Sequence, residues 1–289
     1  MTLKKLVLVL ILRREISLFM NQKIKTSLNN LIKQYYTNYY RDQLGLKDYQ
    51  WRVKNRLNED NDDFYYTASK HIKKIETLLN LRFDNRQKVL VVGAGTGIEM
   101  IQFAKKGCLI YGIEPDKKAL EILKLRSQLQ QLDQNKIKQA VAEKIPYPDN
   151  FFDFVYCWQV LEHVQNVEQS IREMVRVTKP DGYIFIGCPD YRQIAEPHYK
   201  LYLPLFLPRW INKILLKLRG RKTEFFDTLQ SVNAKKIRNI LRHCPVTMMQ
   251  VINTYTDKEL KIHDWRRLMF WIQETFEIEQ DQNWLIKKL

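Results

Sequence analysis

Apolar runs of strand length alternate with helix-like segments through the middle of the chain. The runs stand at residues 88–92, 109–114, 136–142, 152–157 and 183–188. Between them, apolar residues recur at the spacing of helices that bury one face. The expected helices end near Gly107, run from an N-cap at Asp116 to about Leu132, and begin at an N-cap at Asn166 with Gln169 completing a capping box. This alternation predicts an α/β fold with a mostly parallel sheet covered on both faces.

The flanks of this region differ from it. Residues 67–82 have the spacing of a helix packed on one face, with apolar positions at Ile72, Ile75, Leu78 and Leu79. Residues 190–230 hold several prolines and little periodicity. The elements expected after them are a helix over 233–244, a strand over 247–255, a further helix, and a last strand near 276–282. We therefore interpret residues 1–85 as an N-terminal helical arm or lid, and 86–289 as one domain with an insertion at about 190–230.

The first apolar run ends in a glycine-rich turn, VGAGTG. Gly93, Gly95 and Gly97 remove side chains so that a ligand can approach the backbone, and the helix N-terminus that follows favours a carboxylate. Ile98 stands where the dinucleotide fingerprint has its third glycine, and no phosphate-loop lysine follows. Glu114, at the end of the next strand, is placed to accept hydrogen bonds from both hydroxyls of a ribose. The alternative is a tight strand–helix connection without a ligand.

Residues 88–190 resemble a known family through the segments VLVVGAGTG, GIEPD, VAEKIPYPDNFFDFVYCWQVLEHV and IREMVRVTKPDGYIFIGCPD. They are similar to the class I S-adenosylmethionine-dependent methyltransferases, especially the broad type 11 group. The resemblance implies a Rossmann-like methyltransferase sheet of seven strands in the order 3-2-1-4-5-7-6, and S-adenosyl-L-methionine as the cofactor. Residues 86–289 are then the methyltransferase domain.

The resemblance also implies a set of cofactor-binding residues. The turn lines the methionine part of the cofactor, Glu114 holds the ribose, and Ala142 and Glu143 flank the adenine. The end of the fourth strand approaches the sulfonium. The whole set is Gly93, Ala94, Gly95, Gly97, Glu114, Ala142, Glu143, Cys157 and Gln159. Two positions depart from the family pattern, because Val91 and Val141 stand where acidic residues are frequent.

Two histidines are the candidate catalytic residues. Methyl transfer from a sulfonium is a direct displacement, so the protein mainly aligns the nucleophile with the methyl group. His163 lies just beyond the fourth strand, and His198 lies in the insertion beside Glu196 and Tyr199. Either imidazole could be the general base for an acceptor hydroxyl or amine. The alternatives are a packing or capping role for His163 and a structural loop role for His198. No ligand spacing predicts a metal site, and Cys157 is interpreted as a small residue beside the cofactor.

The net charge of +16 in an otherwise ordinary globular composition predicts attraction to polyanions. Within 200–222 there are seven basic residues and no acidic one: Lys200, Arg209, Lys213, Lys217, Arg219, Arg221 and Lys222. After Pro208 the apolar positions form one helical face beside a stripe of Arg209, Lys213 and Lys217. This pattern fits a membrane interface or the entrance for an amphiphilic acceptor. An ordinary docked helix is the alternative, and nucleic acid is less favoured because no recognition motif is present.

The cysteines and the N-terminus bear on location. Four cysteines without pairing or metal spacing favour a reducing compartment, so we expect a cytoplasmic protein in peripheral contact with a membrane. The apolar block Leu6–Leu12 is too short to cross a bilayer, and translation from Met1 or from Met20 fits the sequence equally. The aromatic cluster Tyr35–Arg41 forms either a lid over the cofactor or a helix packed on the domain.

These patterns together predict a methyltransferase for a small or amphiphilic acceptor, of a lipid-linked, glycan or isoprenoid-like kind. A nucleic-acid or protein methyltransferase with the same cofactor is the first alternative. The second is a non-catalytic cofactor-binding scaffold, in which the valines at 91 and 141 mark decay. The identity of the acceptor and the oligomeric state stay open.

Overall fold

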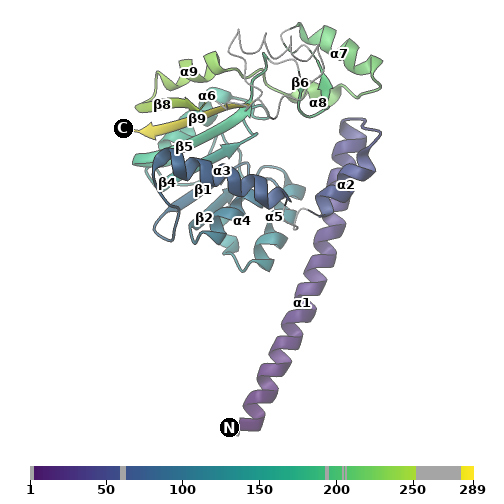
Figure 1. Ribbon diagram of the computed structural model, residues 1–289, viewed down its shortest axis with the longest axis vertical. Helices are drawn as coiled ribbons and strands as arrows, with labels where there is room; N and C mark the ends of the chain where they lie inside the picture. The colour runs from purple at the N-terminus through teal and green to yellow at the C-terminus, as the bar shows by residue number, and fades with distance from the viewer. Residues whose placement is uncertain (1–2, 59–62, 193–194, 204, 206, 252–280) are drawn as a thin grey trace.

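The computed structural model describes residues 3–58, 63–192, 195–203, 205, 207–251 and 281–289. In this part of the chain a seven-stranded sheet has the order β3-β2-β1-β4-β5-β9-β8 (Figure 1). Its strands are β1 (Lys88–Val92), β2 (Leu109–Ile113), β3 (Ile137–Lys138), β4 (Phe152–Trp158), β5 (Thr178–Pro189), β8 (Val246–Val251) and β9 (Asp281–Lys288). The first five are parallel and β9 pairs antiparallel with both β5 and β8. The predicted fold class and strand order are confirmed.

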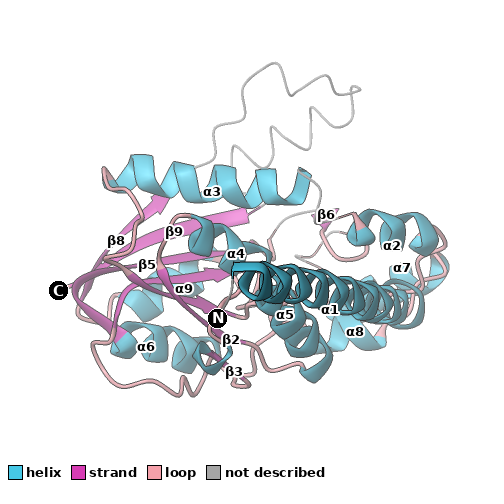
Figure 2. Ribbon diagram, turned by 90° about the horizontal axis from the view of Figure 1, so that it is seen from below, coloured by secondary structure: helices cyan, strands magenta, loops and turns pink. Residues whose placement is uncertain are grey.

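Helices cover both faces of the sheet (Figure 2). They are α3 (Asp63–Leu79), α4 (Ile98–Lys105), α5 (Lys117–Leu129), α6 (Val167–Val177) and α9 (Ala234–Leu241). Alternate residues of β1 divide between two cores because successive side chains of a strand point to opposite faces. Val89 and Val91 pack with α3, α4 and α5. Leu90 and Val92 pack with α6 and α9.

The register of the sheet brings the predicted site residues to one edge. Val92 is opposite Ile113 of β2 on one side and Cys157 of β4 on the other. The three strands therefore end within one residue of these positions. This is the carboxyl edge of the parallel strands, where open α/β sheets bind their ligands.

The predicted helix N-caps are confirmed. Asp116 Oδ1 accepts the Ala119 N–H at 2.7 Å, and Asn166 Oδ1 accepts the Gln169 N–H at 3.0 Å. The capping box at Asn166 is wrong, because the Asn166 N–H donates to Glu143 Oε1 at 3.1 Å. Glu143 lies on the loop after β3, so a tertiary contact takes the place of the local one.

Several element bounds differ from the prediction. The strand expected over 136–142 is reduced to β3, because its remaining residues leave the sheet edge as a loop. β5 begins at Thr178 and passes through a bulge near Phe152 of β4 before its regular pairing starts. β9 covers Asp281–Lys288 and so extends beyond the predicted end near 282, whereas residues 276–280 of that prediction lie outside the described residues. The helix expected between β8 and β9 lies outside the described residues.

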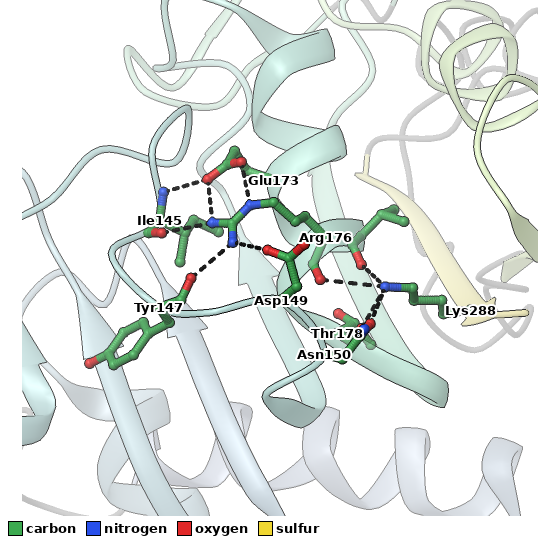
Figure 3. Close-up of polar contacts among 9 residues, drawn as sticks. Ile145, Tyr147, Asp149, Asn150, Glu173, Arg176, Thr178 and Lys288 are labelled. Carbon is green, nitrogen blue, oxygen red and sulfur yellow. Dashed lines mark hydrogen bonds and ion pairs between the residues drawn. The ribbon is translucent and has the colours of Figure 1, made fainter.

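Arg176 at the end of α6 anchors the loop that follows β3 (Figure 3). Its guanidinium donates to the carbonyls of Ile145 and Tyr147, each at 2.9 Å. It also pairs with Glu173 at 2.7 Å and with Asp149 at 2.7 Å. On the same side of the molecule, the Lys288 ammonium of β9 donates to the carbonyl oxygens of Val175 at 2.9 Å and Thr178 at 2.8 Å, and to Asn150 Oδ1 at 2.7 Å. The two cations tie this loop and the last strand to α6.

The N-terminal region consists of α1 (Leu3–Thr37), a short π-helix η1 (Asn38–Gln43) and α2 (Tyr49–Leu57). The first half of α1 extends away from the sheet (Figure 1). Leu28, Ile32, Tyr36 and Tyr40 are buried in a cluster that also contains Ile122 of α5 and residues of the insertion. Among the described residues, no helix is long and apolar enough to cross a bilayer.

The insertion after β5 has little regular structure. It contains the two-stranded pair β6 (Ala195–Glu196) and β7 (Leu201–Tyr202), followed by α7 (Arg209–Leu218) and α8 (Glu224–Thr228). Tyr199 and Leu203 are buried against the N-terminal region. The insertion and the N-terminal arm therefore share one hydrophobic cluster beside the sheet.

Candidate functional site

The glycine turn between β1 and α4 needs glycine for two reasons. Gly93, Gly95 and Gly97 have φ values of 62°, 52° and 97°, in the region that side chains disfavour. A Cβ on Gly93 would also lie 2.4 Å from Val160 Cγ2, and one on Gly97 would lie 2.5 Å from Leu123 Cδ1. At Gly95 the nearest atom outside its immediate neighbours would be 4.0 Å away, so the backbone there has open space beside it.

Glu114 is held against this turn. Its Oε2 accepts the Gly95 N–H at 2.8 Å, and its Oε1 accepts the Asp116 N–H at 3.0 Å. Only 7% of the residue is exposed. Burial raises the pKa of the Glu114 carboxyl, and the hydrogen bonds from Asp116 and Gly95 act in the opposite direction. The carboxylate is therefore fixed at the adjoining ends of β1 and β2, where sequence reasoning expected it to meet a ribose.

Arg126 supports the turn from α5, a contact that sequence reasoning missed. Its guanidinium donates to the carbonyl oxygen of Thr96 at 3.0 Å and to Thr96 Oγ1 at 2.9 Å. The Tyr36 hydroxyl of α1 lies 3.5 Å from the same Oγ1. Arg126 is 30 residues from Thr96 in the chain and reads in the sequence as an ordinary surface position of a helix.

The predicted adenine-side residues lie on the loop after β3. Ala142 is buried, whereas Val141 is exposed and borders a surface hollow with Pro115 and Lys144. Glu143 accepts the N–H groups of Gln165 at 2.7 Å and Asn166 at 3.1 Å. Its carboxylate thus orders the turn into α6, a contact that the sequence did not reveal.

The end of β4 lies between the glycine turn and the insertion. Cys157 is fully buried, and burial followed by the charge of Glu162 raises the pKa of its thiol. A thiolate nucleophile is disfavoured there, and the interpretation of Cys157 as a small residue beside the cofactor stays a prediction. Gln159 takes a φ of 55° and donates its N–H to the Gly187 carbonyl at 2.7 Å, which turns the chain out of the sheet.

The two candidate histidines, 35 residues apart, meet in the structure. His163 Nε2 and His198 Nε2 are 3.3 Å apart, and His198 Nδ1 lies 2.7 Å from Glu196 Oε1. The Phe225 ring borders both imidazoles, with ring centroids 6.0 Å and 5.4 Å away. Burial, and then the charge of His198, lowers the pKa of His163 to about 3, although 37% of its side chain is exposed. The pair lies on the carboxyl side of β4.

The basic helix of the insertion is α7, and two of its basic residues contact α8 or the residue that follows it. Arg209 donates to the carbonyl oxygens of Phe226 and Leu229, and Lys213 pairs with Asp227 at 2.6 Å. The predicted basic stripe therefore lies on α7, and two of its three residues hold α7 to α8. The apolar residues Trp210, Ile214 and Leu218 of the predicted apolar face are exposed.

The chain matches known methyltransferases over its central part. Residues 90–186 match the family model of the methyltransferase domain. An uncharacterized methyltransferase, YcgJ of Bacillus subtilis (strain 168), is 30% identical over 33% of this chain and 38% of its own length. The demethylmenaquinone methyltransferase of Tropheryma whipplei (strain Twist) is 32% identical over 43% of this chain and 51% of its own length. The chain thus spans about half or less of the length of the relatives that it matches.

The structural comparison supports the fold. The crystal structure of the [4+2]-cyclase SpnF superposes with a TM-score of 0.50, 18% identity, and coverage of 76% of this chain and 81% of that one. At this identity the likeness concerns the fold alone, and one fold can carry different reactions.

Residues 90–186 therefore belong to a class I S-adenosylmethionine-dependent methyltransferase domain, as the sequence resemblance implied. This family and the strand order imply S-adenosyl-L-methionine as the cofactor. The site fits that group: backbone with open space at Gly95, an α4 N-terminus without a side-chain cap, and a fixed carboxylate at Glu114.

Proposed function

We propose that the chain is a methyltransferase that moves the methyl group of S-adenosyl-L-methionine to an amphiphilic acceptor. The cofactor part of this proposal rests on the contact of Glu114 with Gly95 at the carboxyl edge of β1 and β2. A charged acceptor placed there can bind two ribose hydroxyls, and the α4 N-terminus can receive the cofactor's carboxylate. The residues Ala142, Glu143, Cys157 and Gln159 complete the proposed cofactor site.

The chemistry follows from what the bound cofactor supplies, a methyl group on a positively charged sulfur. The protein's part is to align an acceptor atom with that group and to exclude water. His198 is the proposed base, because a hydroxyl acceptor must lose a proton as it is methylated. His163 is proposed to border the acceptor beside it, since its lowered pKa of about 3 makes its imidazole a weak proton acceptor. Glu196 faces His198 Nδ1 at 2.7 Å, which orients the ring and leaves Nε2 on the His163 side to receive the proton.

The outward side of α7 supports an amphiphilic acceptor drawn from a membrane. Trp210 is 64% exposed, and Ile214 and Leu218 lie on the same side of the helix at four-residue intervals. Lys217 and Arg219 are exposed nearby. An apolar stripe flanked by cations suits an anionic lipid surface, in which the apolar residues enter the acyl boundary. One relative is named a demethylmenaquinone methyltransferase, and demethylmenaquinone is an isoprenoid quinone of this amphiphilic kind.

A labelled-methyl experiment tests the reaction. The purified full chain is incubated with methyl-labelled S-adenosylmethionine and vesicles made from a total lipid extract. We expect the label in the organic phase. Label in added RNA or protein would contradict the amphiphilic acceptor while preserving methyl transfer, and no label in any fraction would contradict catalysis.

Vesicle flotation tests the surface separately. Trp210→Ser should weaken binding to anionic vesicles, whereas Trp51→Ser should leave it unchanged. Trp51 is a matched control, because it is 62% exposed but lies on α2. Equal flotation of both variants and the wild type would contradict the α7 surface.

A further inference from the structure

A group of metal-ligand atoms gathers beside the carboxyl end of β4. Within the described part of the chain, Glu162, His163 and His198 each place one ligand atom so that all three lie within 4.8 Å of one another. Glu162 and His163 follow β4 on one turn, and His198 comes from the insertion. We propose that these three residues form a binding site for a divalent transition-metal ion of the zinc class.

The distance between the two imidazoles is compatible with a shared ion. His163 Nε2 and His198 Nε2 are 3.3 Å apart, at the long end of the distances for a hydrogen bond between them. Two nitrogens bound to one tetrahedral zinc ion are separated by about 3.3–3.4 Å, given Zn–N distances of about 2.0–2.1 Å. Glu162 Oε1 lies 3.9 Å from His163 Nε2 and all three ligand atoms lie within 4.8 Å of one another, so the carboxylate must move closer to complete a three-ligand set.

The surroundings of His198 match those of a metal-bound histidine. Its Nδ1 lies 2.7 Å from Glu196 Oε1, and Glu196 Oε2 accepts the Tyr199 N–H at 2.6 Å. A carboxylate on the far nitrogen fixes the tautomer that leaves the Nε2 lone pair for an ion. Glu196 is thus a positioning residue.

The charge of the group also favours a cation. Glu162 and Glu196 are fully buried. The side chains beside them are the imidazoles of His163 and His198. A divalent ion would balance two buried carboxylates at the centre of this group. Two histidines, one carboxylate and an open fourth position are the arrangement of catalytic zinc sites.

The proposed ion would lie on the acceptor side of the methyl donor. A metal there can lower the pKa of an acceptor hydroxyl and orient its oxygen. That role rests on the proposed methyl transfer and would replace the histidine base, because a nitrogen bound to the ion cannot accept a proton. The existence of the metal site does not rest on the proposed function. Sequence reasoning gave no sign of the site, because its two histidines are 35 residues apart.

The test measures metal on the tag-free full chain. The protein is stripped with a chelator, loaded with Zn²⁺, dialysed and assayed for bound zinc by mass spectrometry. We expect one ion per chain in the wild type and in His243→Ala, an exposed histidine at the end of α9. His163→Ala and His198→Ala should lose the ion, and Glu196→Gln should bind it about 10–100-fold more weakly. Wild-type protein without bound zinc, or histidine variants that bind like the wild type, would overturn the proposal.

Two further readouts separate the possible failures. X-ray absorption of the zinc-loaded wild type, which needs no variant, should show imidazole nitrogens at about 2.0–2.1 Å. A spectrum with oxygen ligands alone would overturn the site even if the histidine variants fail to fold. The melting shift produced by S-adenosylhomocysteine should persist in His163→Ala and His198→Ala. Its absence in the wild type would instead count against the proposed function and leave the metal result standing.

Discussion

Replacing Arg176 by methionine should destabilise the domain much more than the same change at Arg172 on the same helix. Arg176 donates to the carbonyls of Ile145 and Tyr147 and forms a two-point pair with Glu173, whose side chain is 13% exposed. Within the described part of the chain, the one ion pair of Arg172 is with the exposed Glu168 four residues earlier. Methionine keeps much of the aliphatic stem, so the comparison isolates the guanidinium.

The contacts of Arg176 give the size of the expected loss of unfolding free energy. Its two bonds to carbonyl oxygens contribute about 1 kcal/mol each. The half-buried pair with Glu173 adds up to about 1 kcal/mol, and the pair with the exposed Asp149 adds little. The expected loss is about 2–3 kcal/mol of unfolding free energy for Arg176→Met and at most about 0.5 kcal/mol for Arg172→Met. In thermal melts this corresponds to about 4–8 °C against about 1 °C.

At acidic pH, the difference in unfolding free energy between the wild type and Arg176→Met should become smaller. The hydrogen bonds from Arg176 lower the pKa of Glu173 in the folded state. Such a group stabilises the protein fully above its unfolded pKa of about 4.3, and the stabilisation is lost as the pH falls through the lower folded pKa. Urea melts at pH 7 and at successively lower pH below about 4 measure this. Equal midpoints for the two arginine variants at pH 7, or a gap that widens in acid, would refute the reasoning.

Three other substitutions test the site and the sheet. Glu114→Gln should weaken S-adenosylhomocysteine binding about 10–100-fold by removing a charged acceptor, with the exposed Glu121→Gln as the unaffected control in calorimetry. Gly93→Ala should lower the unfolding free energy by more than about 1 kcal/mol through its positive φ alone. Adding Val160→Ala should recover only the part of the lost stability that comes from the 2.4 Å contact. Full recovery of the melting temperature would argue against backbone strain. Lys288→Met should lower the unfolding free energy by about 2 kcal/mol, because it removes the donor to the carbonyl oxygens of Val175 and Thr178 and to Asn150 Oδ1. An unchanged urea midpoint would contradict this.

Apolar runs and cap residues in the sequence predicted the parts of the fold that depend on residues close together in the chain. The apolar runs located β1, β2 and β4, because most residues of each strand are buried or partly buried. Asp116 and Asn166 were recognisable as caps, since capping is a contact within three residues. The glycine turn and Glu114 were recognisable because a strand pair of known order places their ends together.

The features that sequence reasoning missed depend on contacts between distant residues. Arg126 reaches Thr96, and Glu143 takes the place expected for Gln169 at the start of α6. The meeting of the two histidines needs the fold of the insertion, which has no periodic pattern. The apolar positions of α7 were visible in the sequence, but the hydrogen bond from Arg209 to the Leu229 carbonyl, across 20 residues, was not.

The most direct test of the methyl-donor site is a calorimetric titration of S-adenosylhomocysteine into the purified full chain. We expect saturable binding with one ligand per chain, accompanied by a higher melting temperature. No heat and no change in melting temperature would contradict the assignment of the β1–α4 turn and Glu114 as the methyl-donor site.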